Sequence, residues 1–190
     1  MDNRNFMTNN KGMTLIELLV VITVISILIV ALGFQFTGWV SGYKVESQTK
    51  ELYIDLINTR ARAMQRNRMH FVDLAGNQYN IYEDDNPAPN GDDVANTAVD
   101  TRLSQRNLEP RYPIISSIAR IQFDTNGLAN SLGNKYSICS NAPSDADGAD
   151  YNCITISSTR IKMGKLTTSI ANGGACGTVL ATAVANCVEK

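Results

Sequence analysis

The hydrophobic pattern of the chain begins with a long apolar run near its N-terminus. Residues 13–36 contain a single charged residue, Glu17, and the next charge is Lys44. A helix needs roughly 20 predominantly apolar residues to cross a bilayer, so the run predicts a membrane helix. A secretory signal peptide is the alternative, but its apolar core is about 7–15 residues long. We expect a retained helix with a cytoplasmic N-terminus, because Arg4 and Lys11 precede it.

The helical pattern continues beyond this run and becomes amphipathic. Apolar residues recur at three- and four-residue spacings, as in Leu52, Leu56 and Ala63, which is typical of a half-buried helix. No proline occurs before residue 87. The pattern predicts one helix from Met13 to about Arg68, roughly 80 Å long at about 1.5 Å per residue. Its second half would form the spine of a globular domain.

The period becomes strand-like after residue 69. Two alternating segments, 70–74 and 79–83, flank a Gly76-Asn77 turn and predict a β-hairpin. The remaining strands are expected at 112–115, 117–123, 136–139, 153–157 and 159–165. Acidic loops are expected at 84–101 and 144–150, and a tail of small residues at 167–190. The sequence thus predicts an α+β fold, with a long N-terminal helix packed on an antiparallel β-sheet domain.

Composition and motifs argue against an enzyme. The chain has 17 Lys and Arg residues and 18 Asp and Glu residues, so it lacks the basic character of a general nucleic-acid binder. The single histidine, His70, has no serine or cysteine context, and no nucleophile or phosphate-loop motif is present. The acidic loops fit no calcium motif. We therefore expect no catalysis, no cofactor and no metal.

Four cysteines lie in the last third of the chain. An even number in an exported domain predicts two disulfides, with three connectivities open, whereas zinc binding is disfavoured because no C-x-x-C spacing occurs. Cys139 and Cys153 fall on strands expected to be neighbours. We prefer a bridge between these two, with Cys176 and Cys187 pinning the tail.

Glu17 needs a partner if the apolar run is buried. A carboxylate near the centre of an apolar helix costs up to about 2.5–3.5 kcal/mol on insertion scales. The run contains no basic residue. The partner is therefore either the lipid headgroup region or a positive charge from another chain.

The residues around Glu17 resemble the processing signal of type IV prepilins and type II secretion pseudopilins. A short basic leader ends in Lys11-Gly12 and is followed by Met13 and then by T-L-I-E-L, residues 14–18. The resemblance implies that a prepilin peptidase cuts after Gly12 and methylates the new amine of Met13. It also implies that Glu17 pairs with this amine on a neighbouring subunit.

The same resemblance implies a type IV pilin fold and a domain organisation. Residues 1–12 would be the leader, 13–40 the transmembrane and filament-core helix, 41–68 its amphipathic half, and 69–190 a periplasmic β-rich domain. Met13 replaces the phenylalanine of many major pilins, and Gly33-Phe34 stands where they often carry a proline. Apolar residues other than phenylalanine are tolerated at the first position, whereas the missing proline favours a low-abundance subunit.

Two further segments resemble the GspH/FimT/FimU type of minor pilin: residues 51–74, and the F-D-x-x-G element within 121–127. The chain is thus expected to be a minor pilin in the bacterial inner membrane and then in the pilus (fimbrium). It would prime assembly or occupy the tip with other minor pilins and the major pilin, supporting adhesion, twitching motility or DNA uptake. A type II secretion pseudopilin is the alternative.

A DNA receptor at the pilus tip is the second alternative. Arg160, Lys162 and Lys165 fall where DNA-uptake pilins carry a basic element, so the resemblance implies a weak DNA contact there. Three charges would bind phosphates weakly and with strong salt dependence. The competing interpretation, which we favour, is that these charges protect a sheet edge from pairing.

Overall fold

The computed structural model describes residues 12–88, 91–130, 135–143, 146, 148–176 and 186–190, without the side chains of 31–37. The chain divides into two units, Met1–Thr37 and Gly38–Lys190. Within the described ranges, no helix is both long enough and apolar enough to span a membrane.

The predicted helix is observed as α1, Leu15–Arg66. Thr14 caps its start, because Thr14 Oγ1 accepts the Glu17 N–H at 3.3 Å. At its end Asn67 adopts a left-handed conformation with φ of 51°, and the Arg68 N–H donates to Ala63 O at 3.2 Å. This is a Schellman-type ending, so local backbone chemistry terminates the helix close to the predicted position.

Two antiparallel sheets follow the helix. The first has the strand order β3-β2-β1-β5 and the second the order β4-β6-β7-β8-β9. The first contains β1 (His70–Ala75), β2 (Gln78–Glu83), β3 (Thr101–Asn107) and β5 (Arg120–Phe123). The second contains β4 (Ile114–Ser116), β6 (Tyr136–Ser140), β7 (Cys153–Ile156), β8 (Ile161–Leu166) and β9 (Cys187–Glu189). A short 3₁₀ helix, η2 (Ile170–Asn172), lies in the tail.

The fold class and the hairpin are confirmed, while two strands were missed. Ala75 pairs with Gln78 across the turn, and Gly76 has the positive φ that the turn requires. Strand β3 was missed because it is a polar edge strand without apolar alternation, and β9 because it has three residues. Both strands are hard to predict from sequence because pairing with neighbouring strands, and not the pattern of their own side chains, makes them strands.

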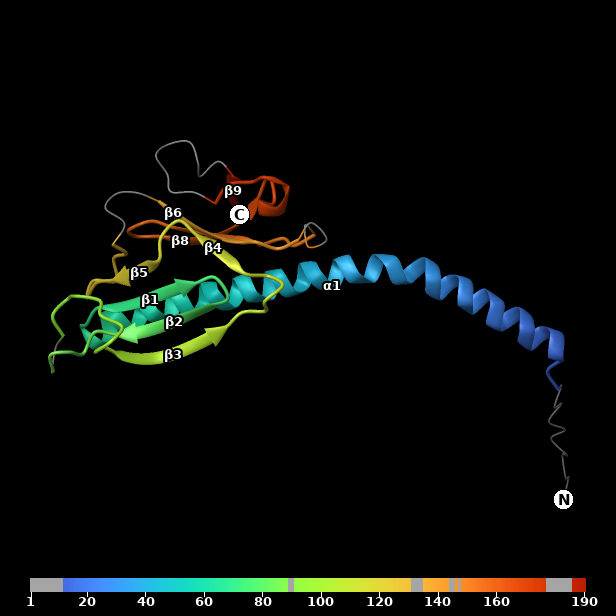
Figure 1. Ribbon diagram of the computed structural model, residues 1–190, viewed down its shortest axis with the longest axis horizontal. Helices are drawn as coiled ribbons and strands as arrows, with labels where there is room; N and C mark the ends of the chain where they lie inside the picture. Colours follow the sequence, from blue (N-terminus) through green and yellow to red (C-terminus); the bar gives the residue numbers. More distant parts are fainter. Residues whose placement is uncertain (1–11, 89–90, 131–134, 144–145, 147, 177–185) are drawn as a thin grey trace, which may run out of the picture. The chain divides into compact units, whose positions relative to one another are not determined.

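One face of α1 supports both sheets (Figure 1). Leu52, Leu56 and Ala63 on this face are at most 2 % exposed. Their neighbours in the common core come from both sheets: Val72, Tyr79, Ile81, Ile121 and Phe123 from the first, and Ile114, Ile138, Ile154, Ile156 and Ile161 from the second. The second half of α1 is therefore the spine of the domain, as its periodicity predicts.

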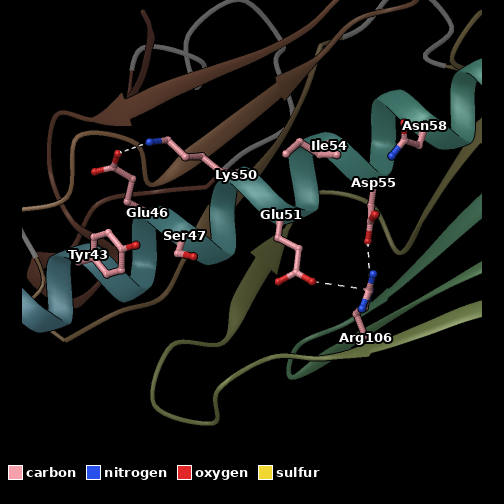
Figure 2. Close-up of a pocket in the computed structure, with 9 residues that line it drawn as sticks. All are labelled: Tyr43, Glu46, Ser47, Lys50, Glu51, Ile54, Asp55, Asn58 and Arg106. Carbon is pink, nitrogen blue, oxygen red and sulfur yellow. Dashed lines mark hydrogen bonds and ion pairs between the residues drawn. The ribbon is translucent and has the colours of Figure 1, made fainter.

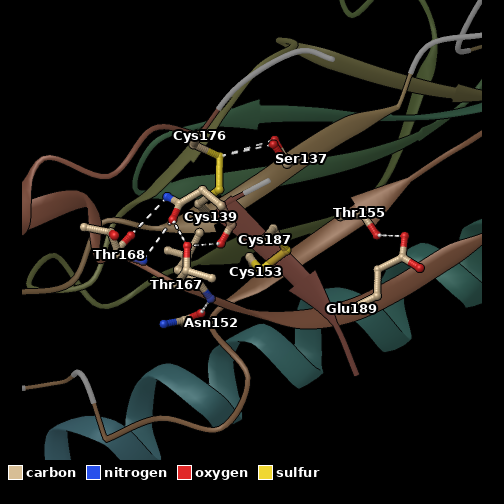
Figure 3. Close-up of a disulfide and its surroundings, with 12 residues drawn as sticks. Ser137, Cys139, Asn152, Cys153, Thr155, Thr167, Thr168, Cys176, Cys187 and Glu189 are labelled. Carbon is tan, nitrogen blue, oxygen red and sulfur yellow. Dashed lines mark hydrogen bonds between the residues drawn. A yellow bond between two sulfur atoms is a disulfide. The ribbon is translucent and has the colours of Figure 1, made fainter. Parts of the chain in front are cut away.

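The preferred disulfide pairing is wrong. Cys139 and Cys153 do oppose each other in register on β6 and β7, but each bonds to the tail, Cys139 to Cys176 and Cys153 to Cys187 (Figure 3). The Cα–Cα distances are 5.9 and 6.1 Å. The tail packs on the sheet face that carries the first two cysteines, forming a small cluster with Leu166. Sequence spacing could not reveal this long-range packing.

Gly164 accommodates the second bridge. It lies opposite Cys153 in the β7–β8 register and opposite Glu189 in the β8–β9 register. A Cβ atom at this position would lie 2.4 Å from Val188 O and 3.1 Å from Cys187 Sγ. Glycine in the middle of β8 therefore permits the close approach of β9.

The observed connectivity can be tested by peptide mapping without reduction. Chymotryptic cleavage after Tyr151 separates Cys139 from Cys153, and cleavage after Leu180 separates Cys176 from Cys187. We expect linked peptides that join Cys139 to Cys176 and Cys153 to Cys187. A peptide joining Cys139 to Cys153 would contradict the structure.

Because a disulfide restricts the unfolded chain, replacing Cys153 and Cys187 together by serine should lower the free energy of unfolding by about 2–4 kcal/mol.

Candidate functional site

The predicted processing site lies just before α1. Gly12 and Met13 are outside the helix and exposed. Thr14 is the N-cap, and Glu17, also exposed, is in the first turn. The T-x-x-E spacing is that of a capping box, and an acid in the first turn is favoured by the helix dipole. Sequence reasoning missed this second role of Glu17 within its own chain, although the spacing signals it.

The apolar part of α1 that follows has no covering surface among the described residues. Every side chain from Leu15 to Val30 is exposed, including Leu15 at 83 % and Ile27 at 69 %. A continuous apolar surface of this kind marks an interaction with another protein or with lipid. The segment therefore combines an exposed apolar helix with one carboxylate close to its start.

The three candidate DNA contacts do not form one surface. Arg160 precedes β8 and, two residues before Lys162, lies on the same face as Lys162. Lys165 points to the opposite face of the strand. Lys162 Nζ lies 2.6 Å from Glu189 Oε2. The expected role in edge protection is wrong, because β8 lies between β7 and β9. The edge of β8 is covered because the tail forms β9, a strand that the sequence did not predict.

A groove runs along the exposed face of α1 in the domain (Figure 2). It has a volume of about 610 Å³ and is lined by Tyr43, Glu46, Ser47, Lys50, Glu51, Ile54, Asp55, Asn58 and Arg106. Its acids are paired: Glu46 with Lys50 at 2.5 Å, and Asp55 with Arg106 at 3.4 Å. Asp55 also accepts the Tyr79 hydroxyl at 2.8 Å. The contacts of Asp55 with Tyr79 and Arg106 hold the helix to β2 and β3.

Comparison with known families identifies the N-terminal segment. Residues 7–33 match the family described as the prokaryotic N-terminal methylation motif. Over these residues the chain is similar to type IV pilins. The match includes Gly12, Met13 and Glu17, and it confirms the family that the sequence resembles.

Solved structures of similar proteins are more distant. The type IV minor pilin FimU of Pseudomonas aeruginosa is 17% identical over 64% of this chain and 88% of that chain, with a TM-score of 0.47. The minor pseudopilin EpsH from the type 2 secretion system of Vibrio cholerae is 10% identical over 63% of this chain and 95% of that chain, with a TM-score of 0.43. No curated protein sequence matches this chain. The family assignment rests on residues 7–33.

The acidic residues of the pilin-like protein at 84–100 organise their own loop. Asp84 is buried, and its carboxylate accepts the N–H groups of Asp92 at 3.3 Å and Asp93 at 2.7 Å. Burial raises the pKa of Asp84 above its usual value. Asp85 accepts the Thr101 hydroxyl at 2.6 Å, which lowers the pKa of Asp85. Among the residues that the structure places, no three His, Cys, Asp or Glu side chains are arranged to hold a metal ion.

His70 of the pilin-like protein is a buried strand residue at the start of β1. Its Nδ1 lies 3.1 Å from Arg68 O, while its Nε2 has no hydrogen-bond partner within the described part of the chain. Neighbouring Glu83 is paired with Arg66 and Arg68. Burial lowers the pKa of His70 below its ordinary value of 6.5. His70 therefore contributes to the pH dependence of stability.

We expect the free energy of unfolding to decrease as the pH falls below about 6.5. The unfolded chain binds a proton on His70 more readily than the folded protein does, so the contribution is complete above the unfolded pKa and is lost as the pH falls towards the folded pKa. Urea unfolding of the full chain in detergent at pH 7.5 and 5.5 measures this loss. The variant His70→Asn should show a smaller difference between the two pH values; an unchanged difference would assign the effect to other groups.

Proposed function

We propose that this pilin-like protein is a minor pilin that enters a type IV pilus as a priming or tip subunit. The observation that carries the proposal is the methylation motif, in which the Gly12–Met13 junction precedes an apolar helix with one acid, Glu17. Removal of residues 1–12 by a prepilin peptidase would create an amine at Met13, which the same enzyme would methylate. The protein acts by assembly and carries out no chemistry of its own.

Electrostatics explain why the new amine matters. Glu17 is costly in an apolar bundle unless a positive charge neutralises it. The cleaved N-terminus of a neighbouring subunit supplies that charge only after processing. Assembly would thereby be restricted to processed subunits, and the exposed apolar surface from Leu15 to Val30 would be buried between helices.

Cellular location follows from the same features. The apolar helix would hold the unassembled subunit in the inner membrane, with residues 69–190 in the periplasm. Two disulfides in this region support export, because such bonds persist in oxidising compartments. A type II secretion pseudopilin would use the same helix, acid and processing step, and crosslinking to pilus or secretion components would separate the two machines.

Processing can be tested at Gly12. The variant Gly12→Val should remain at full length, because a branched side chain next to the scissile bond would obstruct a site that accepts glycine. Intact-mass measurement of the membrane-extracted protein gives the N-terminus directly. The matched variant Asn10→Ala should be cleaved normally. Recovery of a chain beginning at Met13 from the Gly12→Val variant would rule out the proposed cleavage.

Assembly can be tested at Glu17. The variant Glu17→Gln keeps the size of the side chain but removes its charge, so we expect normal processing and a roughly 10- to 100-fold lower incorporation into filaments, as for loss of a charged hydrogen bond. Incorporation is measured by immunoblotting sheared filaments against membranes. The variant Glu51→Gln, in the same helix, is the control for charge alone.

A third variant separates assembly from capping. Thr14→Ala removes the N-cap, which typically costs about 1 kcal/mol of helix stability, but leaves Glu17 charged. We expect Thr14→Ala to assemble. Normal incorporation of Glu17→Gln, or an equal defect in Thr14→Ala, would show that the acid acts through the helix start and not through a neighbouring amine.

A further inference from the structure

A small pocket lies on the five-stranded sheet, away from the processing segment in sequence. Its volume is about 220 Å³, and it is lined by Lys135, Thr155, Ser157, Arg160, Lys162 and Glu189. Three of these side chains are cationic and one is anionic. Formal charges therefore leave two positive charges in excess within a confined space.

The carboxylate of Glu189 occupies part of this pocket. Its oxygens lie 2.6 Å from Lys162 Nζ and 3.5 Å from Lys135 Nζ. The Thr155 hydroxyl donates to Oε1 of Glu189 at 3.2 Å (Figure 3). The hydrogen bond from Lys162 lowers the pKa of Glu189, so the carboxylate is charged at neutral pH. The pocket thus already binds one oxyanion, supplied by the chain itself.

Arg160 provides a cation that Glu189 does not use. Its side chain is exposed, and its guanidinium makes no ion pair with any residue that the structure describes. Its backbone is held in a turn, with the Ser157 N–H donating to Arg160 O at 2.8 Å and the Arg160 N–H donating to Ser157 Oγ at 3.2 Å. A guanidinium presents several donors in a planar fork that matches phosphate geometry.

The walls of the pocket are fixed by the sheet. Lys162 lies opposite Thr155 in the β7–β8 register, and β8 is hydrogen-bonded on both sides. Glu189 is in β9, which the Cys153–Cys187 bridge ties to β7. The donors are therefore held in place before any ligand arrives, which reduces the entropy lost on binding.

We propose that this pocket binds a tetrahedral oxyanion, a phosphate or sulfate group, through Arg160, Lys135 and Lys162, with Glu189 as a built-in competitor. A phosphate monoester carries about −1.5 to −2 charges at neutral pH, which matches the excess charge of the pocket. A carboxylate ligand would bring only one negative charge, and the carboxylate of Glu189 already brings one to the pocket. This proposal does not depend on filament assembly.

The test is direct titration of the full chain in detergent with sodium phosphate, and separately with sulfate and acetate, at pH 7.5 by calorimetry. The ionic strength is held constant at about 0.15 M, where the Debye length is about 8 Å. We expect phosphate and sulfate to bind and acetate to bind at least about tenfold more weakly. The variant Arg160→Gln should weaken phosphate binding at least about tenfold, as for a charged hydrogen bond. The variant Lys165→Gln, on the other face of the same strand, should leave the affinity within about twofold, because screening weakens more distant exposed charges.

The competitor is tested by Glu189→Gln, which should bind phosphate at least about tenfold more tightly because Lys135 and Lys162 are released. An intact Cys153–Cys187 bridge and unchanged thermal unfolding check that β9 is retained. The variant Lys135→Gln, outside β9, gives an independent loss of affinity. Four results would each overturn the proposal. The first two are no phosphate binding and acetate binding as tight as phosphate. The others are equal weakening by Arg160→Gln and Lys165→Gln, and an unchanged phosphate affinity in Glu189→Gln.

Discussion

One face of α1 is the surface on which the domain depends. Leu52, Leu56 and Ala63 are almost completely buried, and both sheets pack on them. Full burial of a leucine side chain is worth about 1.5–3 kcal/mol, and this free energy is shared between strands that are far apart in sequence. Neither sheet has another helix to cover its inner face within the described chain. The single helix therefore holds two sheets in one core.

The apolar residues of the first unit differ from those of the domain in their exposure. Those from Leu15 to Val30 are as apolar as the core of the domain, yet they remain exposed within their own chain. Such a surface marks an interaction with lipid or with another protein. Glu17 makes the two environments unequal, because a buried carboxylate favours whichever one supplies a positive charge. The same element thus carries the intramolecular core of the domain and, in the proposed assembly, an intermolecular one.

The tail shapes the second sheet more than its composition suggests. Cys176 and Cys187 tie it to two neighbouring strands, and Gly164 leaves room for it to approach. The resulting strand β9 turns β8 into an interior strand and brings Glu189 to Lys162. A tail too poor in large apolar groups to form its own core is held by covalent bonds, and it then determines the charge of a pocket on the sheet.

Local periodicity and turn chemistry were sufficient to predict the helix and the hairpin, because each depends on residues close together in sequence. The N-terminal motif, also local, was found by its resemblance to prepilins. Asp124 and Gly127 also form the predicted turn, with the Gly127 N–H donating to Asp124 O at 2.8 Å. Tertiary structure alone decided the disulfide partners of Cys139 and Cys153, the polar strand β3 and the interior position of β8. These features arise from contacts between segments tens of residues apart, and the patterns within each segment do not encode which distant segment packs against it.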